Sequence, residues 1–370
     1  MNYIYIDNDT ALEQAMARCL KAPVVAVDTE FARFNTYYPM VGLLQLGVGS
    51  DNYLIDPLAI SDLSGLKALF LQSETLKVVH AGSEDMEVFQ HWLGCLPTPL
   101  LDTQIAAAML GIGYSMSYQK LVAHCLNLEI PKGETRSDWL ARPLTQSQCD
   151  YAALDVIHLF TLFADLEAQL KRLNRLDWVL AESSRLTESL PTLIEPEQAY
   201  LKLKGLSQLS PRQLQYLRLL AAFRERQAQF KNVPRNRVLE TDELMALAAH
   251  EVHSAAELKA GQLISSRSLR RYGESIVALG LEAKEADVSE LPRRVVGDST
   301  PVNKKKLDRL RQVVADQSKA YGIAPELLSR RRDLESIIKS DNQGQAELPA
   351  SMQGWRQAVV GEPLLAAINQ

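Results

Sequence analysis

Four carboxylates and one phenol stand where ordinary sequence patterns predict strand ends and helix faces. The segment VVAVDTEF places Asp28 and Glu30 at the end of a short β-branched run, where the alternation of side chains sends both to one side of the strand. Asp85 is expected in the first turn of a helix. Tyr151 and Asp155 are four residues apart, so both project from one face of a helix. These five side chains are our candidate catalytic residues.

The chemistry that such a set supports is metal-dependent attack on a phosphate. Oxygen ligands without cysteine or histidine select hard cations, Mg²⁺ or Mn²⁺, over zinc. Carboxylates that gather without a cation repel one another, which raises their pKa values. Two divalent ions would relieve that repulsion, activate a water for in-line attack and stabilise the departing 3′ oxygen. The Tyr151 hydroxyl, with an ordinary pKa of about 10, would orient the water rather than act as a base.

Each piece alone also has an ordinary structural explanation. An Asp-x-Glu at a strand end is commonly a solvated edge, and an acid in a first helical turn is favoured by the helix dipole. Tyr151 and Asp155 alone would be part of an amphipathic helix. The prediction of a catalytic site therefore rests on all three pieces occurring in this order, at a strand end, a helix start and a late helix.

The first half of the chain alternates strand and helix patterns. Strands are predicted at 24–27, 43–48, 53–55 and 77–80, and helices at 63–71, from Ser83 as a cap, and at 104–110, 118–126 and 145–173. The strands 43–48 and 53–55 flank a short turn and are expected to pair antiparallel. A capping box at 145–148 opens the last helix. These patterns predict a mixed α/β domain with its strands early and its helices late.

Beyond about residue 195 the strand patterns stop. Helix starts are predicted near residues 210, 241, 304 and 324. The charged stretch 285–303 is expected to be a linker, and the section after it repeats the plan of the section before it. The second half is thus predicted to form two consecutive all-α modules.

Composition indicates a globular protein of two or three domains. Of 370 residues, 46% are hydrophobic and 23% are charged, and no apolar run is long enough to cross a bilayer. The segment MNYIYIDNDT lacks the basic-then-apolar pattern of a signal peptide. The cysteines Cys19, Cys95, Cys125 and Cys149 form no CxxC pair, so neither a zinc knuckle nor a disulfide framework is indicated. A reducing, cytoplasmic location is the expectation.

The net charge of −5 hides an asymmetry between the two halves. Residues 1–195 carry 13 Lys and Arg against 24 Asp and Glu, a balance of −11, whereas residues 196–370 carry 27 against 21, a balance of +6. The basic clusters 304–306 and 330–332 could track a phosphate backbone. They could equally be solvated helix faces, so charge alone leaves nucleic acid binding open.

Several segments resemble the motifs of one nuclease superfamily. VDTEF, HAGSEDMEVF, LLDTQIAAAML, RSDWLARPLT and YAALDV look like the exonuclease motifs of the tyrosine branch of the DEDD superfamily. Over most of residues 1–195, and in RSDWLARPLTQSQCDYAALDV in particular, the chain is similar to bacterial ribonuclease D. A histidine-branch enzyme would have histidine at position 150, where Asp150 stands. No motif position departs from the tyrosine-branch pattern.

The resemblance implies a fold and a domain order. The fold would be an α/β nuclease domain, with a ribonuclease H-like mixed sheet flanked by helices, followed by two all-α, HRDC-like helical bundles. The resemblance places the nuclease domain at residues 1–195 and the two HRDC-like domains at residues 208–288 and 300–370.

The resemblance also implies an activity and its residues. Asp28, Glu30, Asp85 and Asp155 would bind two Mg²⁺ (or Mn²⁺), and Tyr151 would orient the water. The implied activity is 3′→5′ exoribonuclease, which releases nucleoside 5′-monophosphates from RNA with a free 3′ end, in the trimming of tRNA precursors. No membrane is implied, and protein partners are left unknown.

Two other functions stay open at this point. A 3′→5′ DNA exonuclease would use the same residues, because recognition of the 2′-OH cannot be located from the sequence. A non-catalytic scaffold that binds nucleic acid belongs to another class, and the five intact site residues argue against it. A dinucleotide-binding oxidoreductase fits poorly, since no GxGxxG follows the first strand.

Five residues near the motifs have two interpretations each. His158 and His80 are expected to be packed structural histidines rather than general bases. Gln45 could reach a terminal nucleotide or be a hydrogen-bonded structural amide. Arg136 could meet a phosphate, and Trp139 could pack against the site wall or a base. The alternative for both is a helix-packing tryptophan with a surface ion pair.

Overall fold

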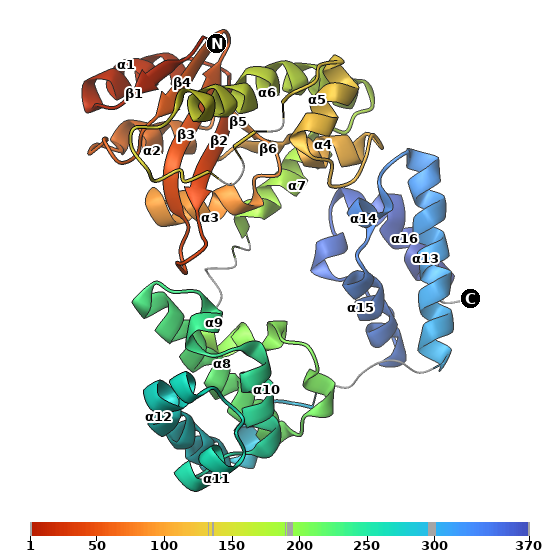
Figure 1. Cartoon of the computed structure of the whole chain (residues 1–370). Coiled ribbons are helices and arrows are strands. Elements are labelled where there is room, and N and C mark those ends of the chain that lie inside the picture. Colours follow the sequence, from red (N-terminus) through yellow and green to blue (C-terminus); the bar gives the residue numbers. More distant parts are fainter. Residues whose placement is uncertain are drawn as a thin grey trace. The chain divides into compact units, whose positions relative to one another are not determined.

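A six-stranded mixed sheet lies at the centre of the N-terminal part of the chain (Figure 1), in the order β1-β4-β3-β2-β5-β6. The computed structural model describes residues 2–131, 133–134, 137–188, 190, 195–294 and 301–368. The strands are β1 (Ile4–Ile6), β2 (Val24–Ala32), β3 (Met40–Val48), β4 (Asp51–Ile55), β5 (Leu76–Val79) and β6 (Leu100–Asp102). β3 pairs antiparallel with both β2 and β4, and the other pairs are parallel. The predicted mixed sheet and the predicted antiparallel β3–β4 pair are confirmed.

Three of the strands differ most from the sequence prediction, and the bounds of the others shift by one to three residues. β1 and β6 were not predicted, because three residues are too few to show a period of two. The predicted strand 24–27 is too short, since β2 continues to Ala32 along its partner β3. Asp28 and Glu30 therefore lie inside a paired strand rather than at its end, and the register shifts only after Glu30.

Helices cover both faces of the sheet (Figure 1). The first set is α1 (Asp9–Cys19), α2 (Ser64–Leu71) and α3 (Ser83–Trp92), and the second is α4 (Thr103–Met109), α5 (Tyr118–Leu126), α6 (Gln146–Arg172) and α7 (Leu176–Glu188). Val25 and Val27 of β2 are buried in the core that α1–α3 form, whereas Ala26 is buried with α4–α6. Because side chains alternate along a strand, this pattern sends Asp28 and Glu30 to the α6 face.

The two helix starts that carry site residues are held in different ways. The predicted capping box at the start of α6 is present, with Thr145 and Gln148 bonding each other's backbone N–H. The expectation that Ser83 caps α3 is wrong, because Ser83 is the first helical residue and Gly82 is the N-cap. A Cβ at Gly82 would lie 2.7 Å from Cγ2 of Val79, so only glycine allows this close approach.

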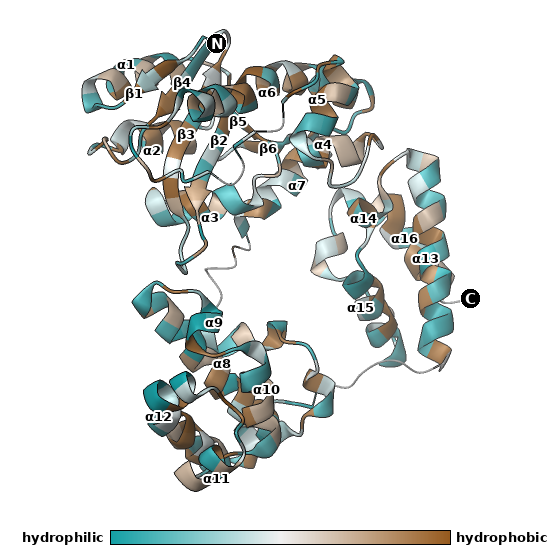
Figure 2. Ribbon diagram, in the orientation of Figure 1, coloured by the Kyte–Doolittle hydropathy of each residue, from teal (hydrophilic) through white to brown (hydrophobic). Residues whose placement is uncertain are grey.

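The second half of the chain is helical, as predicted, and no strand follows β6 among the residues described. Its helices are α8 (Pro211–Lys231), α9 (Arg235–Val238), α10 (Thr241–His250), α11 (Ala255–Ala260), α12 (Ser266–Glu285), α13 (Pro301–Tyr321), α14 (Pro325–Leu328), α15 (Arg331–Asn342) and α16 (Glu362–Ile368). These helices carry both apolar and hydrophilic residues (Figure 2), as expected where one helix face is buried and the other is in solvent. The predicted linker 285–303 is too long at its C-terminal end, since α13 begins at Pro301.

The predicted repeat of the helical plan is confirmed. α8 and α13 have 21 residues each, and each is followed by a left-handed residue, Asn232 (φ 47°) or Gly322 (φ 58°). A four-residue helix and then a longer one follow in both modules, α9 and α10 in the first, α14 and α15 in the second. Corresponding residues in the two modules are 90 positions apart throughout these three helices.

The chain divides into two compact units. One unit consists of Met1–Ala32, Met40–Leu190 and Asp298–Gln370, and the other of Arg33–Pro39 and Pro191–Gly297. The second helical module thus shares a unit with the sheet, and the loop between β2 and β3 belongs to the unit of the first module. The predicted boundaries at residues 195, 208–288 and 300–370 stay predictions.

Across the described residues, none of the helices has both the length and the apolar character that a membrane span requires.

Candidate active site

Three of the predicted site residues meet at one place on the sheet. Carboxylate oxygens of Asp28, Glu30 and Asp155 all lie within 4.8 Å of one another. The two β2 residues face α6, and α6 crosses the sheet closely because position 47 is glycine. A Cβ there would lie 3.1 Å from the backbone oxygen of Val156. Local alternation in β2 and a close helix–sheet contact together create the cluster.

Asp85 is held beside this group rather than within it. It lies in the first turn of α3, as predicted, and is buried. Its Oδ1 accepts a hydrogen bond from Oγ1 of Thr29, the residue between Asp28 and Glu30. The negative charge of Asp85 still raises the pKa values of the three clustered acids, so it contributes to their electrostatics.

Burial raises the pKa values of Asp28, Glu30, Asp85 and Asp155, and neighbouring negative charges add to the effect. Burial is the largest cause for Asp28, followed by the charges of Asp155, Asp85 and Glu30. Burial, then Asp155 and Asp85, raise the pKa of Glu30 to about 9. Burial and Asp85 raise the pKa of Asp155 to about 7, and burial raises that of Asp85 to about 6. Acids that resist ionisation in this way favour a cation among them.

These shifts predict how metal-free protein responds to pH. A carboxyl group whose folded pKa is raised stabilises the fold at low pH, and that contribution is lost as pH rises through the folded pKa. In EDTA we expect the thermal midpoint to fall between about pH 5 and pH 9, the span from the ordinary carboxyl range to the pKa of about 9 at Glu30, by roughly 5 °C or more. Calorimetry across this range measures the effect.

The control for this prediction is saturating Mg²⁺ at each pH. The cation should restore most of the lost stability at high pH and little at pH 5, because protonated acids bind it weakly. An Asp28→Asn variant should show a flatter pH dependence in EDTA. A thermal midpoint that does not change with pH in EDTA would contradict the electrostatic account of the cluster.

Tyr151 stands one helical turn before Asp155 on α6. Burial, and then the charges of Asp155, Glu30 and Asp28, raise its pKa above the ordinary value, so the hydroxyl stays protonated. Its ring lies 6.2 Å from that of Trp139, and a Cβ at Gly133 would lie 2.1 Å from its Cδ2. The phenol is therefore confined on two sides and available as a hydrogen-bond donor.

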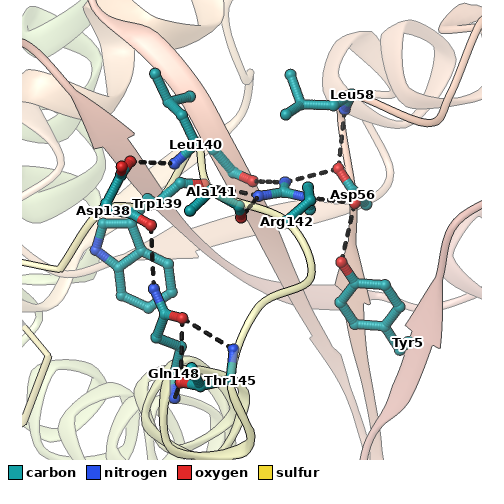
Figure 3. Close-up of polar contacts among 11 residues, drawn as sticks. Tyr5, Asp56, Leu58, Asp138, Trp139, Leu140, Ala141, Arg142, Thr145 and Gln148 are labelled. Atoms are coloured by element: carbon teal, nitrogen blue, oxygen red, sulfur yellow. Dashed lines mark hydrogen bonds and ion pairs between the residues drawn. The ribbon is translucent and has the colours of Figure 1, made fainter.

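A network that sequence reasoning missed fixes the segment before α6 (Figure 3). Arg142 donates from Nε to Oδ2 of Asp56 at 2.6 Å and from Nη2 to Oδ1 at 2.7 Å, and Tyr5 donates to the same carboxylate at 2.9 Å. Nη2 of Arg142 also reaches the backbone oxygen of Gly42, at 2.6 Å. Because Asp56 follows β4 directly and Gly42 lies in β3, this network ties the chain before α6 to the sheet.

A second missed residue, Asp102, positions the start of α3. Its carboxylate accepts hydrogen bonds from the backbone N–H groups of Ala81 and Gly82, each at 3.0 Å, and of Gln104 at 2.7 Å. This buried acid thereby links the loop before α3 to α4 and sets the place of Asp85. Its sequence signal is an Asp that precedes a helix, which is too common to single it out.

The remaining candidates have mixed outcomes. His80 is a structural histidine as expected, bonded to Oγ1 of Thr103 and the backbone oxygen of Met116. Trp139 is only 2% exposed, so it packs beside the site and does not stack on a base. Neither interpretation of Gln45 is supported, because it is fully buried and its amide atoms have no hydrogen-bond partner among the described residues. Arg136 lies outside the described residues.

The predicted basic clusters are mostly exposed. In 304–306, Lys306 pairs with Asp341 at 2.5 Å, and in 330–332, Arg331 pairs with Glu335 at 2.7 Å. The other four side chains are exposed to solvent. Their contact with RNA stays a prediction.

Comparison with known proteins identifies the family. Residues 3–171 match the 3′-5′ exonuclease family, residues 213–279 match the HRDC domain, and residues 301–364 match the C-terminal HRDC domain of ribonuclease D. Ribonuclease D from Pseudomonas paraeruginosa is 40% identical over 99% of this chain and 97% of that protein. This chain belongs to the ribonuclease D family. It is a 3′-5′ exoribonuclease with an α/β nuclease domain and helical HRDC domains, as the sequence resemblance implied.

Solved structures of similar proteins agree with this assignment. The crystal structure of Escherichia coli RNase D, described as an exoribonuclease involved in structured RNA processing, matches with a TM-score of 0.93 at 35% identity. That match covers 100% of this chain and 99% of the other. The catalytic core of RRP6 from Trypanosoma brucei matches with a TM-score of 0.58 at 25% identity, over 76% of this chain and 82% of the other. Membership in an exonuclease family of the DEDD type implies dependence on divalent metal ions, which the acidic cluster fits.

Proposed function

We propose that Asp28, Glu30, Asp85 and Asp155 bind two divalent cations, Mg²⁺ or Mn²⁺, and that these residues and Tyr151 hydrolyse RNA from its 3′ end. The observation that carries this proposal is the convergence of carboxylate oxygens from β2 and α6 within 4.8 Å. The donor set is oxygen alone, and its members repel one another without a cation. Both features fit hard divalent ions and not zinc.

The residues have distinct roles in this proposal. Bound divalent cations supply Lewis-acid chemistry at such a site, namely activation of water and neutralisation of charge on phosphate oxygens. Asp28 and Glu30 on β2 and Asp155 on α6 would hold the cations in position from a strand and a helix. Asp85 adds a fourth carboxylate, which Thr29 orients. Tyr151, kept protonated by its surroundings, donates a hydrogen bond that orients the attacking water.

The substrate we propose is the 3′ end of tRNA precursors, from which nucleoside 5′-monophosphates are released. It is supported by the involvement of the Escherichia coli relative in structured RNA processing and by the basic balance of the helical half. We place the reaction in the cytoplasm, because none of the four cysteines forms a disulfide and such thiols suit a reducing compartment.

The test uses tRNA precursors with 3′ trailers, mature tRNA and matched single-stranded DNA, each with a 3′ or a 5′ label. Stepwise release of mononucleotides from the 3′ label of the precursor, abolished by EDTA, supports the proposal. Equal rates on precursor and unrelated RNA would contradict the tRNA assignment. Faster release from DNA would favour the alternative of a DNA exonuclease, and no release from any polymer would favour a binding scaffold.

Replacing Tyr151 by Phe is expected to lower kcat by about a hundredfold, because a water that is not oriented attacks less often in line. KM should change little, since the ring and its packing against Trp139 remain. The measurement is steady-state release of mononucleotide at saturating Mg²⁺.

Tyr118→Phe is the matched control for this substitution. The Tyr118 hydroxyl donates to the backbone oxygen of Leu154 at 3.2 Å, so its loss should cost about 1 kcal/mol of stability rather than turnover. Equal kcat values for the wild-type enzyme and Tyr151→Phe would remove Tyr151 from the proposed mechanism.

A further inference from the structure

The unit that contains the first helical module has an open cavity of about 330 Å³ on its surface. Its lining includes Arg33 and Thr36 from the β2–β3 loop, Arg224 from α8, Arg235 and Asn236 from α9, and Thr241 from α10. Three arginines line the cavity, and no Asp or Glu does. The volume is at the small end of the range for ligand sites.

Arg224 is the residue that packing alone does not explain. Its side chain is only 6% exposed, and burial lowers its pKa despite the nearby charge of Glu225. Nη1 reaches Oγ1 of Thr241 at 3.2 Å, but the buried Nε has no hydrogen-bond partner among the described residues. A buried guanidinium is costly unless an anion pairs with it, and Thr241, which Arg224 contacts, also lines the cavity.

Glu225 lies behind the cavity and holds one of its arginines. It forms a two-pronged ion pair with Arg235, with Nη2 at 2.5 Å from Oε1 and Nε at 2.7 Å from Oε2, and also accepts from the Tyr37 hydroxyl. The Tyr37 ring in turn lies under the Arg235 guanidinium at 4.6 Å. This network fixes in place Arg235, one of the three arginines that line the cavity.

The repeat within the chain shows that the fold does not require these charges. Ninety positions after Arg224, Glu225 and Arg235, the second module has Val314, Ala315 and Pro325 in the same helices. Val314 is buried in an apolar core. An apolar residue therefore suffices at this place in the three-helix plan. The arginine in the first module calls for another explanation.

We propose that this cavity binds a phosphate group. Arginine side chains match the geometry of phosphate oxygens with paired N–H groups, and Thr241 and Asn236 offer further donors. The source we favour is the backbone of bound RNA, which rests on the proposed function. A free phosphate compound, such as the released mononucleotide, presents the same chemistry.

The loop makes this site part of the enzyme rather than of the helical module alone. Arg33–Pro39 directly follows β2, which carries Asp28 and Glu30, and belongs to the unit of the first module. Oδ1 of Asn232 accepts hydrogen bonds from the backbone N–H groups of Tyr37 and Tyr38, each at 3.0 Å. The isolated module lacks Arg33 and Thr36, so the full-length chain is needed for the complete site.

The test measures RNA binding by full-length Asp155→Asn protein, which holds substrate without turnover. Into it we would introduce Arg33→Gln, in the loop, and Arg224→Met, which keeps volume and removes charge. Each should weaken binding of a single-stranded oligoribonucleotide roughly tenfold, the effect of one charged hydrogen bond. Each should also make the dependence of log Kd on log salt shallower by about 1.

Arg226→Gln is the matched control, because Arg226 also lies on α8 but pairs with Glu197 and does not line the cavity. Arg226→Gln should change RNA affinity much less. If Arg224→Met folds poorly, Arg33→Gln in the loop still tests the site. In the catalytically intact chain, Arg33→Gln should raise KM for the same oligoribonucleotide, whereas Arg226→Gln should leave its hydrolysis unchanged. That comparison separates the two claims, since failure of all hydrolysis would contradict the proposed function and not this site.

Calorimetric titration with inorganic phosphate and with AMP distinguishes a phosphate of the RNA backbone from a free phosphate compound. Reduced RNA affinity together with a shallower salt slope assigns the site to the RNA backbone. Unchanged RNA affinity with phosphate or AMP binding that Arg33→Gln removes assigns it to a free phosphate compound. Unchanged RNA affinity, unchanged salt slope and no phosphate binding would overturn the proposal.

Discussion

Replacing Asp155 by Asn is expected to reduce kcat for release of 3′-terminal nucleotides by at least about a thousandfold, the several kcal/mol that metal-ion charge stabilisation contributes. Asp155 is the member of the cluster that α6 contributes, opposite Asp28 and Glu30 on β2. An amide keeps the size of the side chain but offers a neutral oxygen, which binds a divalent cation weakly. RNA affinity should stay within a few-fold of the wild-type value.

Asp165→Asn is the matched control on the same helix. Asp165 lies ten residues later on α6 and accepts a hydrogen bond from the side chain of Gln169 at 2.9 Å. Its loss should leave kcat unchanged. In EDTA the Asp155→Asn protein should also be at least as stable as the wild type above neutral pH, since it removes an acid whose pKa is raised to about 7. Retention of substantial turnover in Asp155→Asn would remove this acid from the proposed metal site.

The sequence predicted the site residues better than it predicted what holds them. The motif order brought Asp28, Glu30 and Asp155 to attention, and the structure does place their oxygens together. That much follows from local rules, because strand alternation and helical spacing fix where side chains point. Thr29, Arg142 and Asp102 were missed, since each acts on a residue at least 20 positions away in the sequence.

The same limit applies to the fold. The β3–β4 pair, the capping box of α6 and the repeated helical plan leave strong local patterns, and each is confirmed. The division of the chain into two units leaves no such local pattern in the sequence. The loop Arg33–Pro39 contains no helix or strand, yet Tyr37 is buried in the core of the first helical module. Such placements depend on contacts between distant segments, which no periodicity in a single sequence encodes.

The packing of the second helical module against the nuclease domain is another such placement, and it depends on buried charge. Glu182 of α7 and Arg356 are only 7% and 8% exposed, and they form a two-pronged ion pair in which Nη2 lies 2.6 Å from Oε2. Nε1 of Trp355 donates to the same carboxylate at 2.9 Å, and the Trp355 ring stacks on that of Trp178 at 5.2 Å. Side chains of α7 and of the module are thus fixed against each other.

Glu182→Gln is expected to destabilise this contact by about 3–5 kcal/mol, because it leaves the Arg356 charge buried without its counter-ion. Urea or thermal unfolding would show the loss, and hydrogen exchange should increase first in α13–α16. Glu167→Gln, in the exposed i,i+4 pair with Lys171 on α6, is the matched control and should cost only about 0.3–0.5 kcal/mol.

Replacing both partners separates the penalty of an unpaired charge from the value of the pair. Glu182→Leu combined with Arg356→Met should be much less destabilising than Glu182→Gln, since neither charge is then buried alone. If the double variant is as unstable as the single one, the hydrogen bond from Trp355 to Glu182 holds the module to α7, rather than charge balance. Because the double variant leaves Asp28, Glu30 and Asp155 untouched, any loss of turnover that accompanies release of the module would measure how far the nuclease domain depends on it.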